Sequence, residues 1–253
     1  MQSLSVTIIT KNEAHDIREC LQSVQWANEI IVLDSGSTDD TVAICREYTD
    51  KVMVTDWPGY GVQKNRALQQ ASGDWVLSLD ADERVSEALQ AEIKAILAAA
   101  PDAATTGYVA YAIPRLSTYC GKIIRYGDWH KDYCKRLFRR GQARFQDAQV
   151  HESLEVQGKL GKLAAPLLHN TFKDLEEMLD KLNQFSSLSA GMRQQQGRSA
   201  SLLTAIVHGA WTFVRGYIFR LGFLDGREGF VLAVSNAEGS YYRYLKLLYL
   251  RIS

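Results

Sequence analysis

The first third of the chain alternates short apolar runs with longer stretches in which apolar and polar residues recur at helical spacing. The runs are rich in β-branched residues and lie roughly 20 to 25 residues apart: Val6–Ile9, Ile30–Leu33, Val52–Val54 and Trp75–Leu77. The stretches between them predict helices over about Ala14–Val24, Asp39–Tyr48 and Val62–Ala71. Because strands that alternate with helices pair in parallel through crossovers, the pattern predicts an open, mostly parallel α/β sheet with helices on both faces.

The middle of the chain continues with one more helix and further extended segments. A helix is predicted over Ser86–Ala99, before the break at Pro101. Three segments then favour extended structure: Tyr108–Ile113, Arg136–Phe138 and Val150–Val156.

From Asp174 onward the pattern is helical. Apolar residues recur every three or four positions on one face: Leu175, Met178, Leu179, Leu182 and Phe185. Gly191 and the turn at Gln194–Gly197 are predicted to end this helix. Ser201–Leu224 is strongly apolar and aromatic, but polar residues interrupt it. Since no uncharged apolar run reaches the ~18 to 20 residues of a membrane span, this segment favours a helix that lies in the membrane interface.

Charge in the C-terminal part supports an interfacial position. From Trp211 to the end, six basic residues oppose three acidic ones: Arg215, Arg220, Arg227, Arg243, Lys246 and Arg251 against Asp225, Glu228 and Glu238. Net positive charge beside aromatic side chains favours an anionic lipid surface. The alternative is that these helices pack on the rest of the chain or on a second subunit.

Composition changes this picture little. The 253 residues are 46% hydrophobic and 23% charged, enough for the core of one α/β domain with an appendage. The 29 basic and 29 acidic residues balance, so nothing global predicts a nucleic-acid partner. The four cysteines form no C-x-x-C pair, which favours reduced thiols in a cytoplasmic protein. The N-terminus shows no signal-peptide pattern, and its first apolar run is expected to be a strand.

Three polar clusters follow predicted strands, and ligands of open α/β sheets bind at the carboxyl ends of strands. The clusters are Thr10–Glu13, Asp34–Asp39 and Asp80–Glu83. Asp34 is placed to accept from a ribose hydroxyl or a base N–H, and Thr38 or Asp39 to cap the next helix. For Ser37, Thr38 and Asp39 capping alone is the alternative, and for Asp34 and Glu13 it is a turn without ligand.

The third cluster ends a buried strand in three carboxylates, Asp80, Asp82 and Glu83. Their repulsion requires a cation or a helix N-terminus nearby. Since side chains alternate along an extended segment, Asp80 and Asp82 are expected to face one ion. Mg²⁺ or Mn²⁺, held together with the phosphates of a substrate, is the hypothesis. The alternative is a solvated turn that leads into the next helix.

No standard phosphate-binding loop is present. Gly59-Tyr60-Gly61 gives G-x-G, but Lys64 stands where a third glycine would be needed, and G-K-[ST] is absent. Gln63–Arg66 opens a helix instead, where backbone N–H groups and basic side chains are suited to an anion. Ordinary surface charge is the alternative for each of them.

Four blocks resemble the family 2 glycosyltransferases of GT-A fold, in order and spacing, over roughly the first 85 residues. The blocks are S-V-T-I-I-T-K-N-E, I-I-V-L-D-S-G-S-T-D-D-T, G-V-Q-K-N-R-A-L and G-D-W-V-L-S-L-D-A-D-E. With the further block V-H-E-S-L-E-V, most of the chain resembles the small lipopolysaccharide inner-core β-1,4-glucosyltransferases of Gram-negative bacteria. The resemblance implies a Rossmann-like GT-A catalytic domain over residues 1–172, with a nucleotide-binding half to about 100 and an acceptor half from 101. Residues 173–253 would form a helical, membrane-associated appendage.

The resemblance also implies roles for individual residues. A nucleotide-diphosphate sugar would lie across the sheet edge, with a divalent metal between the D-x-D block and the diphosphate. Thr10, Asn12, Glu13 and Asp34 would hold the nucleoside, and Lys64 would lie near the base or the diphosphate. In the D-x-D block, Asp80 would serve the ribose and diphosphate, and Asp82 would bind Mg²⁺ or Mn²⁺ directly.

Inverting glycosyl transfer requires a carboxylate near the acceptor hydroxyl and a stabilised leaving diphosphate. Glu152, in the V-H-E block, is the candidate base, with an edge-strand surface acid as the alternative, and Asp128 and Asp147 are the runners-up. His151 and His169 are candidates for contact with the metal or the diphosphate, although a histidine beside an apolar stretch is more often simply packed. Two further assignments complete the set. Arg136 is expected to steady the diphosphate through a bidentate contact. The aromatic and basic segment Tyr119–Asp132 is expected to stack on a sugar and contact an anionic acceptor.

The sequence therefore predicts a metal-dependent hexosyltransferase, with UDP-glucose as donor and a lipid-linked saccharide, a heptose of the lipopolysaccharide core, as acceptor. It is expected in the cytoplasm, peripheral at the inner face of the cytoplasmic membrane. Two alternatives stay open. A nucleotidyltransferase also uses a sheet-edge acid and metal, although it would begin with a glycine-rich loop. A membrane-associated protein that binds nucleotide sugars without turnover is the other.

Overall fold

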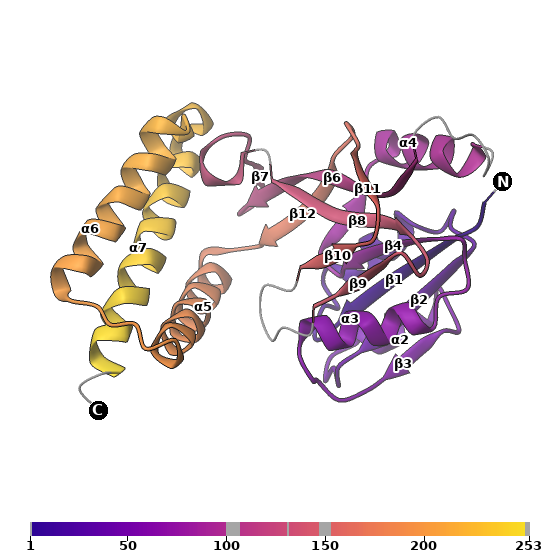
Figure 1. The fold of residues 1–253 in the computed structure, drawn as a ribbon, viewed down its shortest axis with the longest axis horizontal. Helices are drawn as coiled ribbons and strands as arrows, with labels where there is room; N and C mark the ends of the chain where they lie inside the picture. The colour runs from indigo at the N-terminus through magenta and orange to yellow at the C-terminus, as the bar shows by residue number, and fades with distance from the viewer. Residues whose placement is uncertain (1, 100–106, 131, 147–152, 251–253) are drawn as a thin grey trace. The chain divides into compact units, whose positions relative to one another are not determined.

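A computed structural model describes residues 2–99, 107–130, 132–146 and 153–250 (Figure 1). The chain divides into two compact units. The first consists of Met1–Arg115 and Lys131–His169, and the second of Leu116–His130 and Asn170–Ser253. The sequence predicted a single boundary after residue 172. The structure divides the chain differently, because Leu116–His130 groups with the C-terminal helices.

The N-terminal part of the first unit is the predicted parallel sheet. Its strands are β1 (Leu4–Thr10), β2 (Glu29–Asp34), β3 (Val52–Val54) and β4 (Trp75–Asp80), in the spatial order β3-β2-β1-β4. Each neighbouring pair among them is parallel. The crossovers carry α1 (Ile17–Gln22), α2 (Thr41–Arg46) and α3 (Tyr60–Gln69). All four strands and three helices that the apolar pattern predicts are therefore present, with α1 and α2 shorter than expected.

Antiparallel strands extend this sheet beyond β4. They are β8 (Tyr133–Arg139), β6 (Tyr108–Tyr119), β12 (Leu167–Phe172) and β5 (Glu83–Val85), in that order. Strands β11 (Lys159–Lys162) and β7 (Lys122–Ile123) also pair with β6. A separate pair joins β9 (Ala143–Phe145) to β10 (Leu154–Val156). The sheet is mixed, and its parallel half is the part that the crossover pattern predicts.

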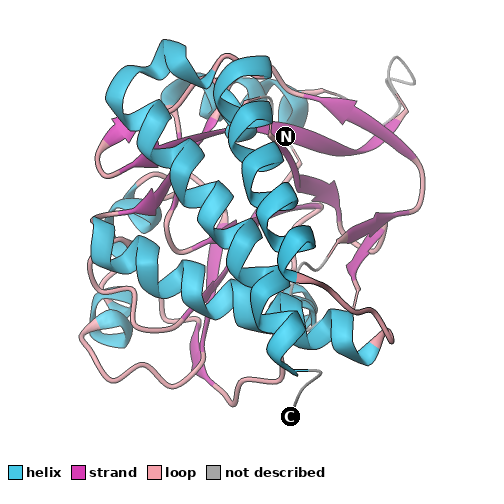
Figure 2. Cartoon of the chain, turned by 90° about the vertical axis from the view of Figure 1, so that its left-hand side faces the viewer, coloured by secondary structure: helices cyan, strands magenta, loops and turns pink. Residues whose placement is uncertain are grey.

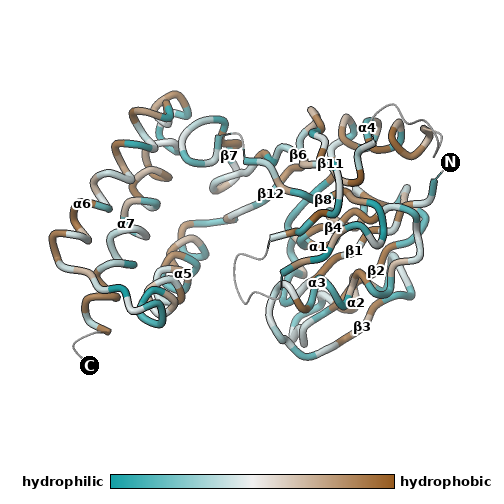
Figure 3. The backbone as a smooth tube through the Cα atoms, in the orientation of Figure 1, coloured by the Kyte–Doolittle hydropathy of each residue, from teal (hydrophilic) through white to brown (hydrophobic). Residues whose placement is uncertain are grey.

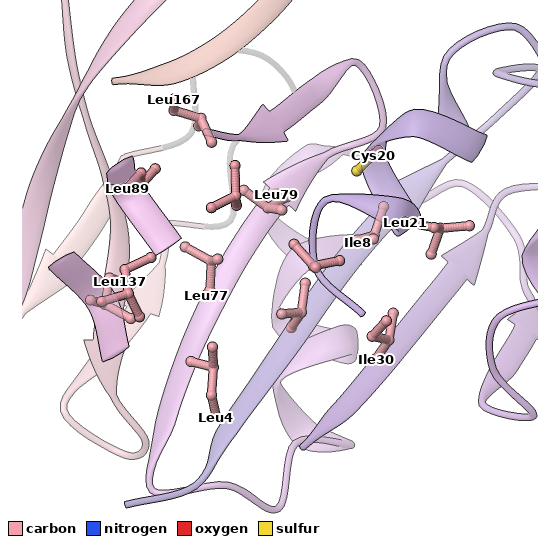
Figure 4. Close-up of a cluster of buried hydrophobic side chains, with 14 of the residues drawn as sticks. Leu4, Ile8, Cys20, Leu21, Ile30, Leu77, Leu79, Leu89, Leu137 and Leu167 are labelled. Carbon is pink, nitrogen blue, oxygen red and sulfur yellow. The ribbon is translucent and has the colours of Figure 1, made fainter. Parts of the chain in front are cut away.

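Alternation along the strands divides the core between the two faces of the sheet. One face carries Leu4, Ile8 and Leu77, which pack with residues of α1 and α4 (Glu87–Ala98), as Figure 4 shows for this cluster. The opposite face carries Ile31 and Leu33 and packs with α3, β9 and β10. Both faces of the parallel strands are therefore covered, and hydrophobic colour predominates along β1 and β2 in Figure 3.

Three long helices dominate the second unit (Figure 2). Helix α5 (Leu175–Gln195) begins at Asp174, whose side chain accepts from the Glu177 backbone N–H at 2.9 Å. Gly191 lies inside α5 rather than at its end, so that part of the prediction is wrong. Helix α6 (Leu202–Val214) begins with a capping box formed by Ser201 and Thr204.

A compact junction connects α6 to α7 (Gly226–Leu250) through the π-helical turn η2 (Arg215–Phe219) and the 3₁₀ turn η3 (Gly222–Asp225). Glycines make this junction possible. A Cβ on Gly229 would lie 2.0 Å from the Gly222 carbonyl oxygen, and one on Gly222 would lie 2.8 Å from the Gly216 carbonyl oxygen. The backbones approach so closely that no side chain fits between them.

Helix α6 exposes much of its apolar surface. Among the described residues, one helical stretch, Leu202–Phe219, is long and apolar enough to cross a membrane by length and composition, and 17% of it is buried. The stretch contains Arg215, so it is not an uncharged run, and the expectation that no uncharged run reaches the length of a span is not contradicted. Leu203 and Phe219 are 69% and 66% exposed, and the hydrophobic colour recurs along α6 in Figure 3.

Candidate active site

The register of the parallel strands brings the three predicted polar clusters to one edge of the sheet. Thr10 at the end of β1 is paired with Asp34 at the end of β2, and Ile9 of β1 is paired with Asp80 at the end of β4. The loops after these strands therefore start side by side. This is the edge at which open α/β sheets bind ligands.

The loops after β1 and β2 bind each other. Asn12, in a left-handed conformation with φ 56°, accepts from the Thr38 backbone N–H at 2.8 Å. Its own N–H donates to the Ser37 hydroxyl at 2.8 Å. The Glu13 N–H donates to the Thr41 hydroxyl at 2.8 Å. These bonds give Asn12 a loop-fixing role, and its predicted contact with a nucleoside stays a prediction.

Asp34 organises its own turn. Its side chain is fully buried, and Oδ1 accepts from the backbone N–H groups of Gly36 and Ser37 at 2.9 and 2.8 Å. The Ser37 hydroxyl donates to Oδ2. The turn predicted as the alternative role of Asp34 is thus present. Its three hydrogen bonds engage both oxygens of the carboxylate. Thr10, next to it, is buried with a hydroxyl that has no hydrogen-bond partner among the described residues.

Asp80 is held by two cations of the protein itself. The Lys64 Nζ lies 2.9 Å from Oδ1, and the Arg136 guanidinium donates to Oδ2. Lys64 and Arg136 are both buried, with 2% and 7% of their side chains exposed. Burial alone would raise the pKa of Asp80, but Arg136 and Lys64 outweigh it and hold the pKa of this carboxyl well below its usual range. Asp80 is therefore a carboxylate at neutral pH.

Glu83 completes this network and is a residue whose role the sequence did not reveal. It is fully buried, accepts from Arg136 at 2.7 Å and from the Asp80 backbone N–H at 3.0 Å, and lies 3.7 Å from Arg115. The repulsion among the acids is thus relieved by Lys64 and Arg136, not by a bound ion alone. Arg136 contacts carboxylates here, and its predicted contact with the diphosphate stays a prediction.

Asp82 stands apart from this network. Ala81 and Asp82 form a turn, so the chain is not extended there. The expectation that Asp80 and Asp82 face one ion through strand alternation is therefore wrong. Instead, Oδ2 of Asp82 lies 3.3 Å from Nε2 of His169. Strand β12 places this histidine, because His169 is paired with Glu83 of β5.

The second oxygen of Asp82 is the feature that points to a ligand. Oδ1 is buried and has no hydrogen-bond partner among the residues that the structure describes. A buried carboxylate oxygen without a partner is costly. The Asp82 oxygen suits either Mg²⁺ or Mn²⁺ when phosphate oxygens and water complete the shell. The His169 nitrogen beside it favours Mn²⁺, because Mg²⁺ prefers oxygen ligands. No group of three or more His, Cys, Asp or Glu suited to a metal occurs within the described ranges.

Helix α3 approaches the same edge with polar side chains that are not surface charge. Lys64 lies 5.4 Å from the centre of the Phe145 ring, and Asn65 exchanges hydrogen bonds of 2.8 and 3.0 Å with the Phe145 backbone. Gln63 is fully buried and donates to the hydroxyls of Ser35 and Thr55. The alternative that these residues only carry surface charge is wrong for Gln63 and Lys64.

The candidate base cannot be placed from this geometry. Glu152, His151 and Asp147 lie outside the described residues, so the assignment of Glu152 stays a prediction. Asp128, the other runner-up, belongs to the second unit, where its carboxylate accepts from Arg215 and Arg220.

The comparison with known proteins decides the family. The model of "Glycosyl transferase family 2" matches residues 5–153, which contain the three polar clusters of the sheet edge but not His169. The chain belongs to glycosyltransferase family 2. Two curated relatives span nearly all of it. An uncharacterized glycosyltransferase of Rickettsia felis is 34% identical over 259 residues, covering 98% of this chain and 90% of the relative. The lipopolysaccharide core biosynthesis glycosyltransferase LpsC of Rhizobium meliloti is 32% identical over 252 residues, covering 96% and 91%.

Among solved structures, glucosyl-3-phosphoglycerate synthase of Mycobacterium tuberculosis, in complex with Mn²⁺, uridine diphosphate and phosphoglyceric acid, is 26% identical. That match covers 47% of this chain and 44% of the synthase, with a TM-score of 0.36. A fragment of TarS from S. aureus covers 99% of this chain with 15% identity and a TM-score of 0.48.

Family membership confirms the resemblance on which the sequence interpretation depended. The α/β architecture with its helical C-terminal region is likewise the one expected for this glycosyltransferase family. Of the two alternatives, nucleotidyl transfer receives no support, since the matching family transfers sugars.

Proposed function

We propose that this family 2 glycosyltransferase is a metal-dependent inverting enzyme that transfers a hexose, glucose from UDP-glucose, to a lipid-linked saccharide. The acceptor would be a heptose of the lipopolysaccharide inner core. The enzyme would work as a peripheral protein at the cytoplasmic face of the inner membrane. The name of the relative LpsC, which covers this chain almost end to end, supports the acceptor class.

One observation carries the proposal: beyond the carboxyl end of β4, the buried Oδ1 of Asp82, beside His169, has no hydrogen-bond partner among the described residues. These two residues would hold Mg²⁺ or Mn²⁺ together with the diphosphate of the donor. When bound, the ion would neutralise the charge that develops on the leaving diphosphate. Most buried side-chain polar atoms in proteins have a partner, so this oxygen is an exception that a bound ion would explain.

The residues around Asp82 are fixed in position before any ligand binds. Lys64 and Arg136 keep Asp80 charged and fixed, and Thr10 offers a buried hydroxyl at the same edge. Preorganised charges of this kind act without reorganisation during the reaction. Glu152 would accept the proton of the acceptor hydroxyl as the sugar is transferred, the role that the family resemblance implies for it.

The decisive experiment measures hydrolysis of several nucleotide sugars with and without Mn²⁺, for the natural protein and for Asp82→Asn. We expect UDP-glucose to be hydrolysed best, metal to be required, and Asp82→Asn to lower the rate by about a hundredfold or more. Asp56→Asn is the matched control, because the Asp56 side chain is 75% exposed and pairs only with Arg66 among described residues. Hydrolysis that is equal in both variants, or indifferent to chelation of metal, would remove Asp82 from the site.

The base is tested separately. Glu152→Gln is expected to lose transfer to the acceptor while it binds UDP with unchanged affinity in a calorimetric titration. If the substitution weakened UDP binding instead, Glu152 would be a donor-binding residue and not the base.

A further inference from the structure

The second unit contains a polar hollow of about 390 Å³ that the donor site does not use. It lies among η1 (Gly127–Trp129), α6, η2 and α7. Its size falls in the range of about 300 to 1,000 Å³ that is typical of small-molecule sites. Basic and aromatic side chains predominate in its lining: Arg215, Arg220, Arg243, His208, Trp211 and Tyr244.

A buried carboxylate fixes two of these arginines. Asp128, with 12% of its side chain exposed, accepts from Arg220 at 2.7 Å and from Arg215 at 3.0 Å, all through Oδ1. Its carboxylate also packs against η2, since a Cβ on Gly216 would lie 3.1 Å from Oδ2. The two guanidinium groups are thereby held in fixed positions at the hollow and still have donors to spare.

The third arginine has no such partner. Arg243 of α7 is half-buried, and its Nε is buried without a hydrogen-bond partner in the described part of the chain. Burial and the nearby Arg193 lower the pKa of Arg243, which reflects an environment that is short of negative charge. Three guanidinium groups face the hollow against one carboxylate, that of Asp128. An excess of two positive charges is therefore left for an anion from outside the chain.

Aromatic rings line the same hollow. Tyr244 stacks on His208 with 4.1 Å between ring centres, and Trp211 and Trp129 complete the lining. The Tyr244 ring also carries the Arg193 guanidinium 5.0 Å from its centre, so the rings offer the hollow mainly their polar groups, which suit the hydroxyl groups of a sugar. Guanidinium groups suit a phosphate or a carboxylate, which they bind in bidentate geometry.

We propose that this hollow binds an anionic saccharide, a sugar that carries a phosphate or a carboxylate. Arg243 and the Asp128-fixed pair, Arg215 and Arg220, would bind the anion, and the aromatic rings would contact the sugar. That this saccharide is part of the acceptor rests on the proposed function, whereas the binding itself does not.

The test is a calorimetric titration of the full chain with glucose 6-phosphate, glucuronate, glucose and inorganic phosphate, without nucleotide sugar or metal. We expect the two acidic sugars to bind and glucose to bind far more weakly. Arg243→Gln should weaken the acidic sugars about tenfold or more. Arg220→Gln should do the same and serves as a second variant, because its side chain is 48% exposed and its loss is less disruptive to folding. Arg227→Gln is the control, with the same charge change on α7 at a side chain that is 87% exposed.

Several results would overturn the proposal. They are no binding of either acidic sugar at millimolar concentration, equal weakening by Arg227→Gln, and inorganic phosphate binding as tightly as glucose 6-phosphate. Displacement of the sugars by phosphatidylglycerol vesicles would assign the hollow to a lipid headgroup instead. Because the titration contains no donor, its failure leaves the proposed transfer reaction standing, and a failed donor-hydrolysis assay leaves this binding site standing.

Discussion

Arg136 has two partners inside the protein, which makes its removal more damaging than the loss of one ion pair. It binds Asp80 and the fully buried Glu83. Arg136→Gln would leave Glu83 with Arg115 at 3.7 Å as its remaining cation. Breaking a buried pair in this way costs roughly 3 to 5 kcal/mol. We expect the free energy of unfolding in urea to fall by that order, whereas Arg46→Gln, at an exposed position on α2, should change it little. Equal stability of the two variants would contradict the network.

The lowered pKa of Glu29 predicts that the free energy of unfolding depends on pH. Its carboxylate accepts from Ser72 at 2.6 Å and pairs with Lys51 at 2.5 Å. Burial opposes ionisation, but the bonds from Lys51, Ser5 and Ser72 outweigh it and lower the pKa of Glu29 from 4.5 to about 2. Because the folded pKa lies below the unfolded one, the stabilisation is complete above pH 4.5 and is lost as the pH falls towards 2.

The measurement compares unfolding of the natural protein and Glu29→Gln at several pH values. A shift of this size corresponds to roughly 3 kcal/mol at neutral pH, of which roughly 1 kcal/mol should disappear by about pH 3.5. The difference between the two proteins should therefore shrink as the pH falls. A difference that stayed constant from neutral to acid pH would show that the charge of Glu29 contributes nothing.

At the scale of residues, the sequence predicted which side chains gather at one edge of the sheet but not which of them bind each other. The acids after β4 and Lys64 on α3 were identified as site residues from their positions after predicted elements. That Lys64 and Arg136 both reach Asp80 depends on the order of strands β1, β4 and β8 in space. No local pattern encodes that order, so Glu83 could not be recognised as their second carboxylate.

At the scale of elements, two glycines of the second unit differ in role: one permits a close backbone contact, and the other has open space around it. Gly229 lies in the first turn of α7 against the backbone of η3, where a Cβ would lie 2.0 Å from the Gly222 carbonyl oxygen. Gly191 lies within α5 with nothing within 4 Å of its ideal Cβ. Gly229→Ala should therefore force the η3–α7 junction apart. Gly191→Ala should raise stability by about 0.5 to 1 kcal/mol, since alanine loses less backbone entropy in a helix.

Thermal unfolding followed by circular dichroism tests the two substitutions together. We expect the midpoint to fall by several degrees for Gly229→Ala and to rise slightly for Gly191→Ala. If Gly229→Ala were as stable as the natural protein, the close contact with the Gly222 carbonyl would not limit the residue at this position, which would contradict the prediction.

The elements of regular periodicity could be predicted from the sequence, whereas glycine made the helix bounds of the second unit harder to predict. Strand alternation and helical spacing identified β1 to β4 and α1 to α5. Gly191 was mistaken for a helix end because glycine costs a helix only about 1 kcal/mol, which the packing of a 21-residue helix outweighs. Gly197, with φ 70°, follows the actual end. No separate bounds were predicted for helix α7, since glycine, serine and asparagine dilute the apolar pattern of its first half.

At the scale of the whole molecule, composition alone predicted a balanced charge and a core of ordinary size. It did not predict the uneven distribution of exposed apolar residues. In α6, Leu202, Leu203, Ile206 and Val207 are each about half exposed or more, although a helix of a soluble domain usually buries its apolar stripe. Burial is a property of the assembled fold, so the sequence could show only that this segment is apolar.

That exposed face leads to a prediction about membranes. Leu203 and Val207 are 69% and 55% exposed, one turn apart on α6. If this face lies in a lipid surface, Leu203→Glu with Val207→Glu removes two apolar contacts worth about 2 kcal/mol each when fully buried. Co-sedimentation with phosphatidylglycerol vesicles should fall by at least about tenfold. Gln195→Glu with Gln196→Glu is the matched control, because it adds the same charge at exposed positions of the same unit without removing apolar surface.

The variants also discriminate among the arrangements that would cover this face. Equal vesicle binding by both double variants would contradict a lipid contact through α6. If Leu203→Glu with Val207→Glu instead converted a dimer to monomers in sedimentation velocity, the face would contact a second copy of the chain.

Extraction of the natural protein from membranes by alkaline carbonate would indicate an interfacial helix, since a spanning helix resists it. We expect carbonate to release the protein, because Arg215 lies within Leu202–Phe219 and its guanidinium is bonded to Asp128, outside that stretch. A span would have to draw this ion pair into hydrocarbon, where charged groups are strongly disfavoured.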